Sequence, residues 1–321
     1  MARVLLLNCF LPSTPSCTDR LAAELFSSVA SDLQRLQKSL EQSPPNLRWC
    51  REAMLVVKKT HSHFLDYFER TQDSNPLESV TMVDEYMSAS LDLLDSCNLL
   101  KSAVTGLDRQ RVMVEFMVKT VKDASFITMA DKIKLERNEI EESNNLFKFT
   151  KWREMDVNER NVSKVKIRSR RKMQVLQPIS SIMSIISLFI FYSILHPIPV
   201  KIHERFYKGF QNMDLFSEYV RKLAITFGKK LQDVQGKGRS VLHENAMIQD
   251  TLAGFTAEFV SGKAGKDERK LAERLDTLKD SSLALKQGID LFESVVNELF
   301  EDVIKGRKRV IGLVTTNNQN L

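Results

Sequence analysis

A heptad pattern near the C-terminal end of the chain constrains its fold more than any other feature. Apolar residues alternate at spacings of four and three over residues 271–313, and only Ser282 and Gly306 interrupt them. A repeat of this length predicts one helix of more than about 35 residues, with a narrow apolar seam that faces partner helices. We expect it to pack antiparallel on earlier helices without a break at Ser282. The seam residues are Leu271, Leu275, Leu278, Leu285, Ile289, Phe292, Val296, Leu299 and Val303.

The rest of the chain is also helical in character. Its 321 residues include only 11 Gly and 8 Pro, and no stretch alternates as a strand does, which argues against a sandwich or a barrel. We predict an all-α fold, an elongated bundle of long antiparallel helices with one central apolar helix. In such a bundle, we expect the apolar seam to contact other helices of the same chain. The alternative is that it forms a coiled coil with another molecule. The other predicted helices run from Thr18 to the SPPN segment at 43–46, then over 47–70, 77–104 (ended by Gly106), 206–231 and 240–260, with one or two more before Trp152.

A long uncharged segment occupies the middle of the chain. No Asp, Glu, Lys or Arg lies between Lys172 and Lys201, and its apolar part, residues 179–196, is bracketed by Pro178 and Pro197. About eighteen helical residues rise roughly 27 Å, close to the thickness of a hydrocarbon core. Several serines offset the gain from its Ile, Leu and Phe residues. The segment therefore fits either a membrane-spanning helix or the core helix of a large bundle.

A dense basic block precedes this segment. Basic side chains beside an apolar segment favour contact with anionic headgroups, so we predict association with the cytosolic face of an endomembrane or of the plasma membrane. If the segment spans, the positive-inside bias places this flank in the cytosol, and the sequon at Asn161 stays unmodified. The residues assigned to membrane-surface contact are Lys164, Lys166, Arg168, Arg170, Arg171 and Lys172.

These features divide the chain into six parts. An N-terminal tail with several Ser and Thr and no acid before Asp19 makes plastid targeting an alternative location. The parts are the N-terminal tail (1–17), an N-terminal helical region (18–155), a basic linker (156–172), the apolar, potentially transmembrane segment (173–200), a C-terminal helical region (201–314) and a tail (315–321).

Signatures of catalysis are missing from the sequence. It contains no HExxH, GxSxG or GxGxxG motif. His61 and His63 point about 200° apart on a helix, so we expect them to be solvated or to cap, and not to share a metal. The four cysteines lack short paired spacings, which favours a reducing compartment and buried or inert thiols over disulfides or a zinc site. We predict no enzymatic activity, no metal or other cofactor and, because the basic clusters lack aromatic platforms, no nucleic-acid partner.

Three stretches resemble the plant BYPASS family. WCREAMLVVKKTHSHF (residues 49–64) and VDEYMSASLDLLDSCNLL (83–100) are similar to the family's aromatic-led helix with Thr-His near its end and to its D-E-Y and L-L-D-x-C-N segments. VNELFEDVIKGRKRVIGLV (296–314) is similar to its closing helix, and a central apolar segment is also a family trait. The matching positions are Thr60, His61, Asp84, Glu85, Tyr86, Leu93, Leu94, Asp95, Cys97 and Asn98.

This resemblance implies a helical, non-enzymatic protein. The family is associated with root-to-shoot signalling, in which its loss lets a mobile growth-arresting compound accumulate, and it includes relatives that bind the exocyst tether. By resemblance alone, we expect a developmental regulator that restrains a root-derived signal through protein–protein contacts at a membrane. The alternative is a trafficking adaptor that engages an exocyst subunit through the final helix.

Overall fold

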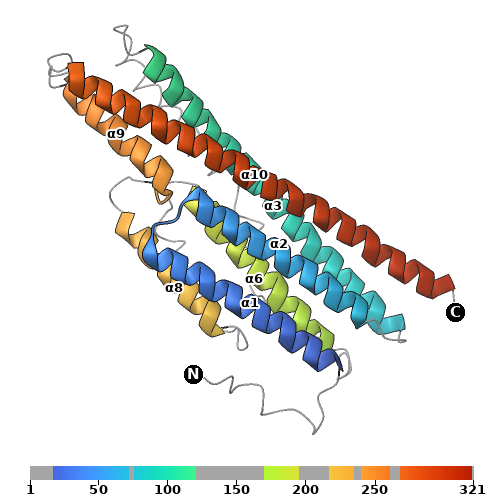
Figure 1. Ribbon diagram of the computed structural model, residues 1–321. Helices are drawn as coiled ribbons and strands as arrows, with labels where there is room; N and C mark the ends of the chain where they lie inside the picture. Colours follow the sequence, from blue (N-terminus) through green and yellow to red (C-terminus); the bar gives the residue numbers. More distant parts are fainter. Residues whose placement is uncertain are drawn as a thin grey trace.

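Long helices make up almost all of the described structure. The computed structural model of the protein describes residues 17–71, 76–120, 170–194, 217–234, 240–260 and 268–319. Within these ranges there is no strand, and the helices lie roughly along one axis (Figure 1). The prediction of an elongated all-α bundle is confirmed.

The first two helices form an antiparallel hairpin. α1 (Cys17–Gln42) and α2 (Leu47–Arg70) are joined by a short turn that contains two prolines. Asn46 has an extended backbone, and its side-chain oxygen accepts a hydrogen bond from the backbone N–H of Trp49 at 2.7 Å, which caps α2. Across the hairpin, Trp49 Nε1 donates to the carbonyl of Leu36 at 3.2 Å. Both boundaries of α2 agree with the predicted range of 47–70.

The third helix is longer than predicted. α3 (Pro76–Thr120) has 45 residues and continues through Gly106, so the predicted end there is wrong. A glycine inside a helix costs about 1 kcal/mol. Burial of one flanking side chain, such as Val104 or Leu107, contributes about 1.5–3 kcal/mol. Packing on either side of Gly106 therefore outweighs the intrinsic preference of the glycine.

The uncharged segment forms the central helix of the bundle. α6 (Arg170–Ile194) contains Pro178, so the prediction that this proline bounds the helix is wrong. Val175 and Leu176 in the preceding turn are buried, and their packing compensates for the hydrogen bond that a proline removes. The helix packs against both α2 and α3, and none of residues 178–194 is exposed.

Of the described helices, α6 alone is long and apolar enough to cross a membrane. More than half of the most apolar part of Val175–Ile194 is nevertheless buried inside the bundle. Ser187 and Ser193 are buried as well, and their hydroxyls donate to the carbonyls of Met183 and Phe189, one turn earlier. α6 thus has the length and composition of a span while it serves as a core helix.

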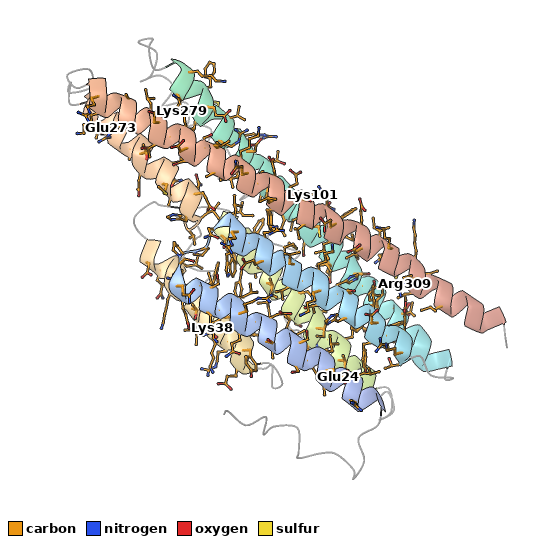
Figure 2. All side chains as sticks on the ribbon, viewed as in Figure 1. Glu24, Lys38, Lys101, Glu273, Lys279 and Arg309 are labelled. Carbon is orange, nitrogen blue, oxygen red and sulfur yellow. The ribbon has the colours of Figure 1, made fainter. Side chains whose placement is uncertain are left out.

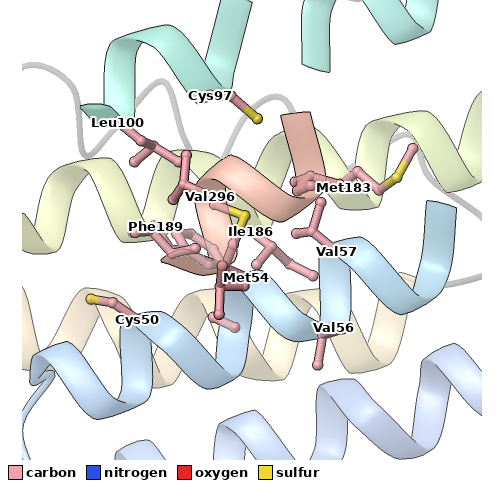
Figure 3. Packing of buried hydrophobic residues seen from close by; sticks show 14 of the residues in the cluster. Cys50, Met54, Val56, Val57, Cys97, Leu100, Met183, Ile186, Phe189 and Val296 are labelled. Carbon is pink, nitrogen blue, oxygen red and sulfur yellow. The ribbon is translucent and has the colours of Figure 1, made fainter. Parts of the chain in front are cut away.

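The core joins helices that are far apart in sequence. Figure 3 shows Met54 of α2, Ile186 of α6 and Val296 of α10 packed together, with two cysteines at the edges of the cluster. Cys50 and Cys97 are free and buried. Burial raises the pKa of Cys97 to about 12 and that of Cys50 further, so both stay protonated at neutral pH. For these two residues, the prediction of buried thiols outside any disulfide is confirmed.

Two shorter helices cover the sides of the bundle. α8 (Ser217–Val234) packs on α1, and α9 (His243–Val260) packs on α10. Phe227 of α8 lies against Trp49 and Phe189, with ring centroids 6.0 and 4.7 Å apart. Both helices were predicted here, although residues 206–216 of the first prediction lie outside the described residues, as do 121–152.

The last helix runs the full length of the molecule. α10 (Glu268–Gln319) has 52 residues and passes Ser282 without a break, which confirms the predicted single helix. It is antiparallel to α3, because Ser282 lies beside Glu115 whereas Arg307 lies beside Met87. It is parallel to α2 (Figure 1). Since α2 and α3 are antiparallel to each other, a helix that packs on both is parallel to one, and the predicted antiparallel packing holds for α3 but not for α2.

Candidate functional site: a buried polar junction of three helices

A small polar cluster joins α2, α3 and α10 inside the apolar core. His61 Nε2 lies 3.2 Å from the hydroxyl of Tyr86, and the two rings are stacked with centroids 6.2 Å apart. His61 is 2% exposed and Tyr86 is 2% exposed. The expectation that His61 is solvated or caps a helix is therefore wrong. We call His61, Tyr86, Gly306 and Arg307 the polar junction.

Gly306 supplies the space that this cluster needs. A Cβ at this position would lie 2.6 Å from the Tyr86 hydroxyl, 2.7 Å from Leu65 Cδ1 and 3.3 Å from His61 Cε1. No larger residue fits without displacing these neighbours. The interruption of the heptad pattern at Gly306 thus marks a close approach of α10 to side chains of α2 and α3.

Arg307 fixes the register of α10 against α3. Its NH1 group donates to the carbonyl of Met87 and to Ser90 Oγ, both at 2.6 Å. Ser90 Oγ in turn donates to the same carbonyl at 3.0 Å. These charge-assisted bonds satisfy polar groups in a partly buried place, where leaving them unpaired would be costly.

The second interruption of the seam faces a second polar cluster. Arg111 of α3 is buried and donates from Nε to Asp108 at 2.6 Å and from NH1 to Glu115 at 2.5 Å. Ser282 of α10 donates to the same Glu115 oxygen at 3.4 Å. A leucine at position 282 would leave this carboxylate without that donor. Ser282 and Gly306, the two residues that interrupt the apolar seam, therefore both lie next to polar clusters that a larger apolar side chain would disturb.

Ionisation at the polar junction does not suit acid–base catalysis. Burial lowers the pKa of His61 to about 4, against a smaller opposing effect of Asp302. Burial raises the pKa of Tyr86 to about 12, opposed by Arg307 and Arg309. A general base works best with a pKa near the operating pH, and neither group has one. Among the described residues, no group of three or more His, Cys, Asp or Glu side chains is placed to hold a metal ion.

Most predicted seam residues lie inside the chain's own bundle. Leu275 is partly buried, and the side chain of Leu271 lies outside the described residues. The buried seam residues are Leu278, Leu285, Ile289, Phe292, Val296, Leu299 and Val303.

The basic block is largely outside the described structure. The backbone of the first turn of α6 contains three of its members, and nothing is described of their side chains. Those three are Arg170, Arg171 and Lys172, whereas Lys164, Lys166 and Arg168 lie outside the described residues, as does Asn161.

Charged groups on the rim reinforce the contacts of α10. Lys58 of α2 donates to Glu298 at 2.7 Å, and its pKa is raised, chiefly by that hydrogen bond. Arg309 bonds to Glu69 at 2.6 Å, and the ammonium of Lys101 lies 4.4 Å from the centre of the Phe300 ring (Figure 2). Each exposed contact contributes about 1 kcal/mol or less, so the core decides stability and the rim adds specificity.

Two leucines on the outer face of α10 were missed by the sequence analysis. Leu283 is 54% exposed and Leu291 is 56% exposed, while the seam residues beside them are buried. Eight residues correspond to about 80° around a helix, so both lie on one outward face. Their positions outside the heptad register were the signal that distinguishes them from the core.

The three stretches that resemble the BYPASS family meet at the polar junction. His61 belongs to the first stretch, Tyr86 to the second, and Gly306 and Arg307 to the third. Comparisons with known proteins found no matching family model, no matching curated protein and no matching solved structure. The resemblance therefore rests on the residues quoted for it.

Proposed function

We propose that this protein is a non-enzymatic helical scaffold of plant development that acts at a membrane by binding other proteins. In the manner of the BYPASS family, it would restrain a root-derived mobile signal that arrests shoot growth. The observation that supports this proposal best is the meeting of all three resembling stretches at one buried junction. Shared sequence patterns of this kind maintain a fold, and a scaffold needs a fixed surface more than a reactive centre.

The test is a growth experiment with a variant that leaves the fold intact. In a plant that lacks the endogenous protein, the parent chain should restore shoot growth. A chain with Leu283→Glu and Leu291→Glu should fold normally, because both side chains are exposed, but should restore growth poorly. As the matched control, Lys286→Glu and Gln287→Glu change charge on the same exposed face without removing apolar area. Full rescue by the leucine variant would contradict the proposed binding surface.

An exocyst-binding adaptor is the second candidate, and the exposed leucines of α10 favour it. Apolar side chains on an outward helix face are typical anchors for a partner helix. Deleting residues 271–313 would remove most of α10 together with its buried seam, so the two leucine substitutions are a sharper test. The parent should recover exocyst subunits in a pull-down and the leucine variant should not. Equal recovery with both chains would rule out this surface as the exocyst contact.

Membrane association is proposed to depend on the basic block. Enclosure of α6 by α2 and α3 favours attachment at the surface over a span. Changing Arg168, Arg170, Arg171 and Lys172 to Gln should weaken binding to anionic vesicles, most clearly at low salt, since each is worth about 1 kcal/mol near the surface. Carbonate washing should release the native protein. Retention after carbonate and release only by detergent would instead indicate that α6 spans.

A further inference from the structure

Helix α9 lies along the first half of α10. Gly254 packs against the guanidinium of Arg274, and Leu47 of α2 contacts both Gly288 of α10 and Glu244 of α9. These contacts place α9 antiparallel beside α10, and Figure 1 shows the pair at one end of the molecule. The second half of α10 is enclosed by α2 and α3, whereas the first half has α9 and the end of α3 as its neighbours.

Two backbone contacts anchor the start of α9 to the turn between α1 and α2. The N–H of His243 donates to the carbonyl of Pro45 at 2.9 Å. The N–H of Leu47, at the start of α2, donates to Glu244 Oε1 at 3.0 Å. Glu244 therefore serves as a capping acceptor for a helix that is distant in sequence, and its charge suits the positive end of the α2 dipole.

This anchor is only partly satisfied. Glu244 Oε2 is buried and has no hydrogen-bond partner among the described residues. Burial raises the pKa of Glu244, opposed by its hydrogen bonds and by His243. A buried carboxylate oxygen without a donor destabilises the state that contains it. Docking of α9 is thus weaker than its apolar contacts alone would make it.

α9 packs on the first part of α10, which contains the start of the seam. Leu278 and Ser282 are buried in this part, and Ser282 faces Glu115 of α3. Ile248 and Leu252 of α9, four residues apart on one helix face, belong to the apolar core. A partner helix with Ile or Leu at such spacing would satisfy the same surface.

We propose that α9 is a displaceable cover helix, held by the Glu244 anchor, and that an apolar helix of a partner protein takes its place on α10. This inference rests on the proposed scaffold function and adds an autoinhibitory step to it. In the closed state, α9 occupies the first part of the seam. In the open state, the α2–α3–α6 core and the second half of α10 stay folded while the first part of the seam becomes available.

The experiment uses the full chain and a fluorescent peptide of residues 240–260 as the probe. Ile248→Ala removes a buried anchor of α9 without changing α10, and Met247→Ala is the matched control, since Met247 is 43% exposed on the same helix. Ile248→Ala should tighten peptide binding, measured by fluorescence anisotropy, by roughly 30-fold. Met247→Ala should change it by about twofold or less.

Hydrogen exchange separates a cover helix from a cooperative part of the core. Amides of α9 should exchange roughly 100-fold faster than those of α2 and α6, and Ile248→Ala should accelerate exchange in α9 alone. Equal acceleration in α2, α6 and α9, or no peptide binding by either chain, would overturn the proposal. The proposed scaffold function is tested separately by the variant with Leu283→Glu and Leu291→Glu. If the cover-helix proposal is overturned but that variant still fails to bind its partner, the scaffold function is supported and only the cover-helix proposal is wrong.

Discussion

The two halves of α10 carry one heptad pattern but meet the rest of the molecule differently. Residues 285–310 pack between α2 and α3, where His61, Tyr86 and Arg307 have hydrogen-bond partners, although Thr60 Oγ1 of α2 is buried and has none among the described residues. Residues 268–284 lie beside α9 and the end of α3, near an anchor with an unsatisfied carboxylate oxygen. The apolar seam thus specifies that other helices pack on α10 along its length. The polar contacts beside the seam determine how stable that packing is in each half.

The largest expected effect concerns Gly306 in the firmly packed half. Gly306→Leu should lower the free energy of unfolding by about 3 kcal/mol, because a side chain there overlaps Tyr86 and Leu65. Chemical denaturation measures this change. The control is Gly312→Leu, where an added Cβ would meet no atom of another element within 4 Å and the change should stay within about 1 kcal/mol. Similar losses in both variants would mean that the junction is no tighter than the rest of α10.

Acidification should loosen the same half through His61. Its pKa is about 4 in the folded protein and near 6.5 when unfolded, so the neutral ring contributes stability above pH 6.5 that is lost as pH falls through 4. The loss approaches about 3 kcal/mol once pH is below 4. His61→Gln should remove this part of the pH dependence in denaturation curves recorded from pH 7 to 4. An unchanged profile in the variant would assign the acid sensitivity to other groups.

A smaller loss is expected for the register contact. Arg307→Met keeps the length of the side chain but leaves Ser90 and the Met87 carbonyl without their donor, which should cost about 2 kcal/mol. Lys308→Met, at an exposed neighbour, should change the free energy of unfolding by about 0.5 kcal/mol or less. Thermal and chemical unfolding of the two variants distinguish these outcomes. Equal stability would show that Arg307 is not needed for register.

Sequence patterns predicted the helices well and their polar contacts poorly. The heptad spacing predicts α10 because it is periodic over many turns, and the SPPN segment at 43–46 predicts the break before α2 because helix-breaking residues act locally. The helix ends predicted at Gly106 and Pro178 were wrong, because burial of the surrounding side chains outweighs the local preference of a single residue.

The polar junction was beyond the reach of such patterns. His61 and Tyr86 belong to different helices, and only packing brings them to 3.2 Å. Sequence periodicity gives the face of a helix but not the residue opposite it. Ser282 and Gly306 were visible as interruptions of the seam, so the irregular positions were the one sequence signal that marked both polar clusters.

The smallest expected effect is a gain, and it tests the weakly anchored half directly. Glu244→Gln keeps an oxygen that accepts from the Leu47 N–H but removes the buried charge, so the free energy of unfolding at pH 7 should rise by about 1 kcal/mol. The pKa of Glu244 is raised in the folded protein, so its contribution is favourable at low pH and is lost as pH rises through that pKa. The advantage of the variant should therefore shrink as the pH falls through that raised pKa, and it should be gone below about 4.5, the usual value for the group. If α9 is a cover helix, the same substitution also slows hydrogen exchange in α9 and weakens binding of the 240–260 peptide. A loss of stability at pH 7 would show instead that the charge of Glu244 at the start of α2 outweighs the unsatisfied oxygen, and that this half of α10 is anchored as firmly as the other.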